Sequence, residues 1–132
     1  VSPDEKFMVV SDYNGHALTV YDVASGRVER TIGGSDAGSG GGRFTNPHKL
    51  CFTPGGGNLL VCDYGNNRVQ ELTLAGGHIR NIAVEMPWSV CCNREVIVVG
   101  CGGTGARPAV AERIVGAGDV RFGIGGAAVA IP

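Results

Sequence analysis

The sequence has little net charge, few aromatic residues and no long apolar run. Its 11 Lys and Arg residues nearly balance 12 Asp and Glu residues, which gives a formal net charge of −1. A protein with so little net charge does not attract the phosphate backbones of nucleic acids nonspecifically. No stretch reaches the roughly 18 uncharged apolar residues that a membrane-spanning helix requires. The composition therefore argues against nonspecific nucleic-acid binding, and we expect no membrane partner.

Local signatures of catalysis are also lacking. A glycine-rich run, Gly38 to Gly42, is followed by Arg43 and Phe44, whereas a phosphate-binding loop would continue with Gly-Lys-Ser/Thr and a helix. There is no Gly-x-Ser-x-Gly nucleophile elbow. We therefore interpret the run as a connector and expect no enzyme, no catalytic residue and no cofactor.

The cysteines and histidines do not have the spacing of a metal site. Five cysteines, an odd number, do not describe a closed disulfide framework, and none has the partner two to four residues away that is typical of structural zinc. We favour free thiols in small core positions over a disulfide or a metal, and with them an intracellular, cytoplasmic protein. The chain starts at Val1 without a targeting segment, which suggests a piece of a longer protein. The residues concerned are Cys51, Cys62, Cys91, Cys92, Cys101, His16, His48 and His78.

Glycine is abundant, at 23 of 132 residues, and 43% of the chain is hydrophobic. The apolar runs are five to seven residues long, are bounded by Gly, Asn, Asp or Pro, and show no helical stripe. This pattern predicts an all-β protein with tight turns. Leu72 and Leu74 have the opposite parity from Val69, for which a β-bulge is the available explanation. The predicted strands are Phe7 to Val10, Ala17 to Val23, Arg27 to Ile32, His48 to Thr53, Asn58 to Cys62, Arg68 to Leu74 and His78 to Val84.

The order of strands and turns repeats with a period near forty residues. The segment from Asn46 to Cys51 is echoed by the one from Met86 to Cys91. The segment from Leu60 to Asp63 is echoed by Val9 to Asp12 and, more loosely, by Val98 to Cys101. Units of about forty residues with four strands each are a signature of β-propellers.

One unit carries a specific motif. It has a proline, an apolar pair, a glycine turn and an apolar strand, then Asp-x-x-Asn-x-Arg-Val. This stretch, residues 47–72, closely resembles the NHL repeat, and the run from Gly38 to Pro47 resembles the connector that precedes blades in that family. The first unit has Ala17 and Leu18 in place of the Arg-Val pair, and the third has Cys101 in place of the aspartate. The motif positions are Pro47, Leu50, Gly57, Asp63, Asn66, Arg68 and Val69.

The resemblance implies a partial β-propeller of about three four-stranded antiparallel blades. We divide the chain into a partial first blade (1–34), a glycine-rich connector (35–46), a complete NHL-like blade (47–84) and a degenerate third blade with a Gly/Ala-rich tail (85–132), in which residues 118–123 suggest a last outer strand. NHL-like propellers are usually closed rings of six blades. We therefore expect either a fragment of a longer propeller or a subunit that completes its ring by self-association.

In a propeller, the loops between second and third strands emerge on the same face as the connectors between blades. Phe44 and Trp88 could instead fill the joints between blades. Asp12 and Asp63 are interpreted as residues that fix turns rather than as acid catalysts, and Arg68 as a tie between blades. The binding residues that we predict on that face are Tyr13, His16, Arg43, Tyr64, Asn67 and Trp88.

The resemblance suggests a noncatalytic module that binds a protein or peptide partner through this face. An alternative is single-stranded RNA, which some NHL propellers hold there with basic and aromatic residues. A less favoured alternative is a metal-dependent lyase or hydrolase, because propeller enzymes similar to this family collect metal ligands from several blades.

Overall fold

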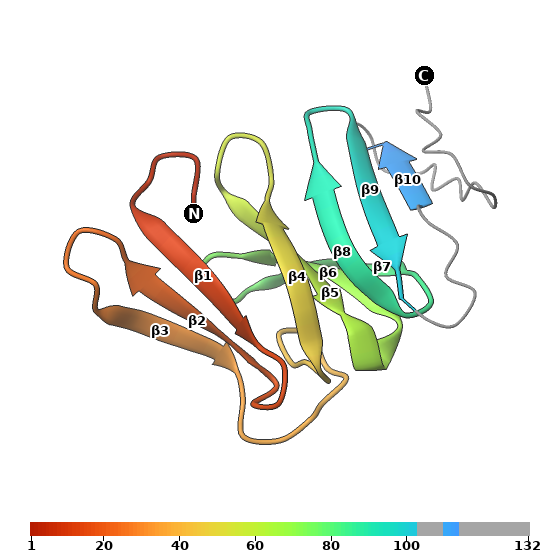
Figure 1. Ribbon diagram of the computed structural model, residues 1–132, viewed down its shortest axis with the longest axis horizontal. Helices are drawn as coiled ribbons and strands as arrows, with labels where there is room; N and C mark the ends of the chain where they lie inside the picture. Colours follow the sequence, from red (N-terminus) through yellow and green to blue (C-terminus); the bar gives the residue numbers. More distant parts are fainter. Residues whose placement is uncertain (103–109, 114–132) are drawn as a thin grey trace.

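The computed structural model describes residues 1–102 and 110–113, which form three antiparallel sheets (Figure 1). Each sheet connects strands in sequence order. The expectation of an all-β partial β-propeller is confirmed. One 3-10 turn, η1 (Tyr64–Asn66), is the helical element of the described residues. The strands are β1 (Phe7–Asp12), β2 (Ala17–Asp22) and β3 (Val28–Gly33) in the first sheet, β4 (Pro47–Phe52), β5 (Asn58–Asp63), β6 (Arg68–Thr73) and β7 (His78–Ala83) in the second, and β8 (Pro87–Cys92), β9 (Val96–Cys101) and β10 (Val110–Arg113) in the third.

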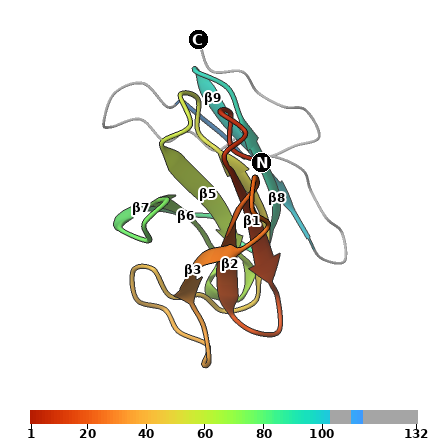
Figure 2. The ribbon, with the colours of Figure 1, turned by 90° about the vertical axis from the view of Figure 1, so that its left-hand side faces the viewer.

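The three sheets are arranged like the blades of a fan. Strand β4 contacts β1 on one side and β8 on the other. Strands β3 and β7 end the first and second sheets, and β7 lies on the other side of the molecule from β8 in the view of Figure 2. Strand β4 is therefore an innermost strand, and β7 is an outermost one. The first sheet has no strand in β4's position among the described residues.

Two hydrophobic cores separate the sheets, and β5 contributes to both. Leu59 and Val61 belong to the first core, together with Leu18 of β2. Leu60 belongs to the second core, together with Val99 of β9. Because side chains alternate along a strand, a continuous apolar run can fill two cores. The second sheet therefore packs against the first sheet on one face and against the third sheet on the other.

Phe44 fills the joint between the first two sheets. It is fully buried in the first core. Gly33 makes room for its ring, because a Cβ atom there would lie 2.8 Å from Phe44 Cδ2 and the residue has a φ of +75°. The interpretation of Phe44 as a joint residue is thus confirmed.

The parity change in β6 does not come from a bulge against β5. Val69 lies opposite Cys62, and Leu72 lies opposite Leu59, in a regular register. Val69 is in the second core and Leu72 in the first, so each side chain points to a different sheet. A register shift does occur between Glu71 and Leu72, but in the pairing with β7. Burial on both faces, rather than a bulge, explains the pattern.

The predicted outer strand at residues 118–123 lies outside the described residues. Among those that are described, no helix has the length and apolarity needed to cross a bilayer.

Candidate functional site

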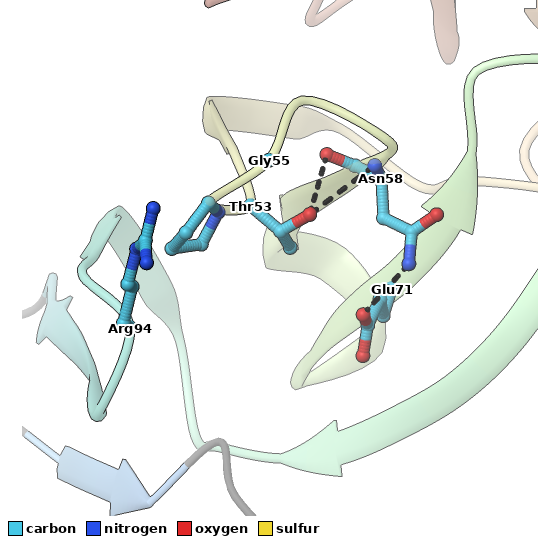
Figure 3. A pocket seen from close by; sticks show the side chains of 6 residues that line it. Thr53, Gly55, Asn58, Glu71 and Arg94 are labelled. Carbon is cyan, nitrogen blue, oxygen red and sulfur yellow. Dashed lines mark hydrogen bonds between the residues drawn. The ribbon is translucent and has the colours of Figure 1, made fainter.

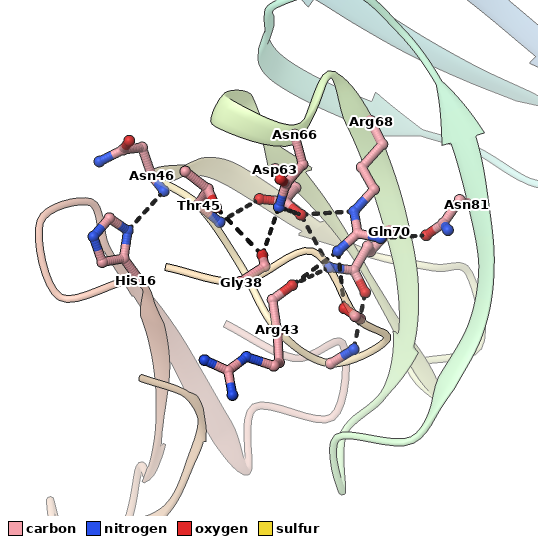
Figure 4. A network of polar contacts seen from close by, with 12 residues as sticks. His16, Gly38, Arg43, Thr45, Asn46, Asp63, Asn66, Arg68, Gln70 and Asn81 are labelled. Carbon is pink, nitrogen blue, oxygen red and sulfur yellow. Dashed lines mark hydrogen bonds and ion pairs between the residues drawn. The ribbon is translucent and has the colours of Figure 1, made fainter. Parts of the chain in front are cut away.

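Asp63 anchors the connector that precedes the second sheet (Figure 4). Its carboxylate accepts a hydrogen bond from the backbone N–H of Thr45 at 2.8 Å and from Asn66 Nδ2 at 2.9 Å. Arg68 Nε donates to the same carboxylate at 2.7 Å, and Gln70 Nε2 donates at 3.1 Å. The side chain of Asp63 is fully buried, so these donors replace the water that it loses on folding.

Arg68 and Gln70 extend this network along the connector. Arg68 Nη2 donates to the carbonyl oxygens of Gly40 and Arg43, each at 2.9 Å. Gln70 Nε2 also donates to the Arg43 carbonyl, at 2.7 Å, and Gln70 Oε1 accepts from the N–H of Gly42 at 3.1 Å. The motif residues therefore hold the glycine-rich run by its backbone, and Arg68 ties the connector to its own blade, whereas a tie between blades was expected.

His16 and Asn67 play the same part in successive units. Both have left-handed backbone conformations, with φ of 54° and 51°. His16 Nδ1 accepts a hydrogen bond from the N–H of Asn46 at 3.0 Å, and Asn67 Oδ1 accepts one from the N–H of Met86 at 3.0 Å. Asn46 and Met86 each precede the proline that begins the next sheet. Two of the predicted binding residues thus fasten the start of one sheet to the turn of the sheet before it.

Four aromatic rings from three sheets gather at one end of the strands. The ring centroids of His48 and Trp88 are 3.6 Å apart, and the planes are inclined by 32°. Tyr64 meets Trp88 edge to face at 5.7 Å, and Tyr13 meets His48 edge to face at 6.0 Å. Tyr13 and Tyr64 are 6.4 Å apart, so the contacts close a cycle. We call these four residues the aromatic cluster.

The repeat explains why these rings meet. Each tyrosine follows the aspartate at the end of a strand, and His48 and Trp88 each follow the proline at the start of β4 and β8. Tyr13 and Trp88 are 40% and 42% exposed, whereas His48 and Tyr64 are half-buried. Trp88 therefore does not fill a joint as Phe44 does. It presents part of its indole at the surface.

His48 is the member of the cluster that the predicted binding set omitted. The spacing of the three histidines in sequence argues against a metal site but has no bearing on which sheets lie side by side. The echo between Pro47-His48 and Pro87-Trp88 is the signal that could have identified it. Its Nδ1 atom is buried and has no hydrogen-bond partner among the described residues.

Arg43 contributes its backbone to the polar network and holds its side chain elsewhere. Its Nη2 donates to the carbonyl of Asp36 at 3.3 Å, within the connector. In the described part of the chain, the Arg43 side chain forms no hydrogen bond with the aromatic cluster. Of the six predicted residues, the structure therefore brings together Tyr13, Tyr64 and Trp88.

The five thiols are free, and four of them contribute to the packing of the second core. Cys51 Sγ lies 3.6 Å from Cys92 Sγ, a contact between unbonded sulfurs. Burial raises the pKa of Cys62 to about 12 and raises the pKa of Cys51, Cys92 and Cys101 as well. Cys91 is exposed, so the expectation of a packed thiol is wrong for that residue. No group of three potential metal-ligating side chains occurs among residues 1–102 and 110–113.

A pocket of about 380 Å³ lies near the other ends of β4 and β5 (Figure 3). Thr53, Asn58 and Glu71 line one side, and Arg94 comes from the turn between β8 and β9. The Glu71 carboxylate already accepts from Asn58 Nδ2 at 3.2 Å and from Arg80 Nε at 2.6 Å. These bonds use both carboxylate oxygens within the fold, and none of the predicted binding residues lies in this pocket.

Comparisons with known proteins agree with this geometry. Residues 44–72 match the family model of the NHL repeat. Among solved structures, the chain is similar to Kuenenia stuttgartiensis hydrazine synthase, with a TM-score of 0.71 and 20% sequence identity over 86% of this chain and 31% of that chain. The chain thus spans less than a third of that protein's length, and at this identity the likeness shows the fold alone. A search of curated proteins found no match.

Proposed function

We propose that this chain, a β-propeller segment that contains an NHL repeat, is a noncatalytic module that binds a protein or peptide partner through the aromatic cluster. The observation that supports this most is the convergence of Tyr13 and Trp88, both about two-fifths exposed, with Tyr64 and His48. Tyrosine and tryptophan side chains combine a large apolar surface with a polar tip and dominate the energetics of protein contacts.

The cluster is also held in place before any partner arrives. His48 and Trp88 are on β-strands, and Tyr64 begins a short 3-10 turn next to the buried Asp63. Rings fixed in this way lose little conformational entropy on binding. The unpartnered Nδ1 atom of His48 further distinguishes the cluster from a finished core, where polar atoms are paired.

Trp88 makes the proposal testable without a label because it is the sole tryptophan of the chain. Peptides selected from a displayed random library would be titrated against the purified protein while Trp88 emission is recorded. We expect saturable changes in emission and, for Tyr13→Ala, a loss of affinity of about tenfold or more. Ile79→Ala is the matched control because Ile79 is exposed on β7, away from the cluster, and should bind the same peptides normally.

A mixed-sequence single-stranded RNA is the second probe. The proposal would be contradicted if no peptide were selected and the protein bound RNA in a salt-sensitive way that Tyr13→Ala and Tyr64→Ala abolish. The aromatic cluster would then be assigned to nucleic-acid recognition. Peptides that bind Tyr13→Ala and the parent protein equally would also contradict it.

A further inference from the structure

Two thiols in the second core contact each other between neighbouring sheets. Cys51 Sγ on β4 lies 3.6 Å from Cys92 Sγ on β8. Cys92 Sγ also donates to the carbonyl oxygen of Phe52 at 3.3 Å, so it contacts β4 twice. Both cysteines are free and half-buried. The first strands of the second and third sheets therefore meet through two sulfur atoms that are not bonded to each other.

The repeat explains why these two sulfurs meet. Cys51 is the fifth residue of β4, and Cys92 is the sixth residue of β8. Successive side chains of a strand point to opposite faces of its sheet, so the fifth and sixth residues face different neighbours. Phe52, the sixth residue of β4, packs against the first core, whereas Cys51 packs against the second. The fifth residue of β4 thus faces the third sheet, and the sixth residue of β8 faces the second sheet.

Cys91 is adjacent to Cys92 in sequence but is not placed to bond with it. The two residues are neighbours on β8, so their side chains point to opposite faces of the sheet. Cys91 is exposed, whereas Cys92 packs against the second core. The partner within reach of Cys92 is therefore Cys51, which is 41 residues away in sequence.

A bond between these sulfurs requires only a small movement. A disulfide has an S–S separation of about 2.05 Å, so the two atoms, now 3.6 Å apart, must approach by about 1.5 Å. Rotation of the two short side chains supplies a movement of this size. Burial raises the pKa of both thiols, but a hydrogen bond from Cys51 to Cys92 favours the Cys92 thiolate and opposes ionisation of Cys51. Cys92 is therefore the nucleophile of the pair.

We propose that Cys51 and Cys92 form a reversible disulfide, which joins the second and third sheets, when the protein meets a small-molecule disulfide. The Cys92 thiolate attacks one sulfur of the small disulfide, whose S–S bond breaks and releases one thiolate. Cys51 then loses its proton and attacks Cys92 Sγ, which forms the protein disulfide and expels the second thiolate. The released thiolates take up the two protons that the cysteines lost. The small disulfide thus gains the two electrons that the protein gives up.

Oxidised glutathione is the probe for this reaction. The folded full chain is incubated with it at pH 8, remaining thiols are blocked with iodoacetamide, and peptides are mapped without reduction. We expect the peptides that contain Cys51 and Cys92 to be linked with the loss of two hydrogens, and dithiothreitol to restore both thiols. Cys51→Ala should lose the link and retain glutathione on Cys92, because the second step then lacks its nucleophile.

Cys91→Ala is the matched control, because Cys91 is next to Cys92 in sequence and should leave the link intact. In the chain unfolded in urea, we expect a mixture of pairs instead of one. The inference is overturned if the folded parent adds glutathione to Cys91 while Cys51 and Cys92 stay reduced, or if Cys91→Ala loses the link. The same mixture of pairs in the folded and the unfolded chain would also overturn it.

Discussion

Asp63 and Asp12 occupy the same position in the repeat but differ in burial and in the hydrogen bonds that they accept. The carboxylate of Asp63 is buried and accepts from four donors that come from the connector, η1 and β6. Asp12 is exposed and accepts the N–H of Gly15 at 2.8 Å within its own turn. The difference arises because the glycine-rich connector passes over Asp63. The backbone groups of the connector need hydrogen-bond partners there that water cannot supply.

We predict that Asp63→Asn strongly destabilises the fold. The amide would present N–H groups to Asn66, Arg68 or Gln70, which are donors themselves, and Arg68 would lose its buried counter-charge. The free energy of unfolding should fall by about 3 to 5 kcal/mol, as for other broken buried ion pairs. Urea denaturation followed by circular dichroism measures this.

Asp12→Asn is the matched control. An exposed aspartate with one turn hydrogen bond contributes about 1 kcal/mol or less, so this variant should unfold near the parent midpoint. Equal losses in the free energy of unfolding for the two variants would show that the network around Asp63 stabilises the fold no more than one exposed turn hydrogen bond does.

At the scale of elements, β5 is the strand on which the arrangement of the sheets depends. All residues from Leu59 to Asp63 are buried, and successive side chains enter different cores. A strand with two buried faces couples its neighbours, because each face supplies apolar contacts to a different neighbouring sheet.

We predict that neighbouring truncations on β5 loosen different sheets. Leu59→Ala opens a cavity in the first core and Leu60→Ala opens one in the second, each at a cost of about 2 to 5 kcal/mol. Native-state hydrogen exchange read by mass spectrometry should rise in β1 to β3 for Leu59→Ala and in β8 and β9 for Leu60→Ala. The same exchange pattern in both variants would contradict the division into two cores.

At the scale of the whole molecule, the packing of the sheets decides how the thiols behave. Cys62 is fully buried between two sheets, whereas Cys91 of the third sheet is exposed. Because the thiolate is the reactive form, a raised pKa protects a buried cysteine at neutral pH in addition to its inaccessibility.

We predict that iodoacetamide at pH 8 labels Cys91 first and Cys62 last in the folded protein. Burial raises the pKa of Cys62 to about 12, so its thiolate fraction at pH 8 is lower than that of an ordinary thiol and its labelling is slowed in addition to its inaccessibility. Peptide mapping after timed quenching measures the order, and the urea-unfolded chain is the control, in which the five thiols should react at similar rates. Early labelling of Cys62 in the folded chain would contradict its placement.

Much of the fold could be predicted from local patterns. Apolar runs bounded by Gly, Asn and Asp indicate short strands because turn residues and side-chain alternation act between close neighbours in sequence. The forty-residue echo then indicates blades, and the match of residues 44–72 to the NHL repeat agrees with it. Of the candidate site, the two tyrosines and Trp88 could be placed on one face in this way.

What the sequence by itself determined is therefore the strands, their turns, the repeat and the residues that the repeat brings to one face. Only the tertiary structure decided that His48 joins the aromatic cluster, that His16 and Asn67 tie sheets together, and that Cys91 is exposed while Cys51 is packed. The reason is that repeat positions are chemically alike in sequence, whereas burial and pairing depend on whether another sheet lies alongside. That neighbour comes from a part of the chain tens of residues away.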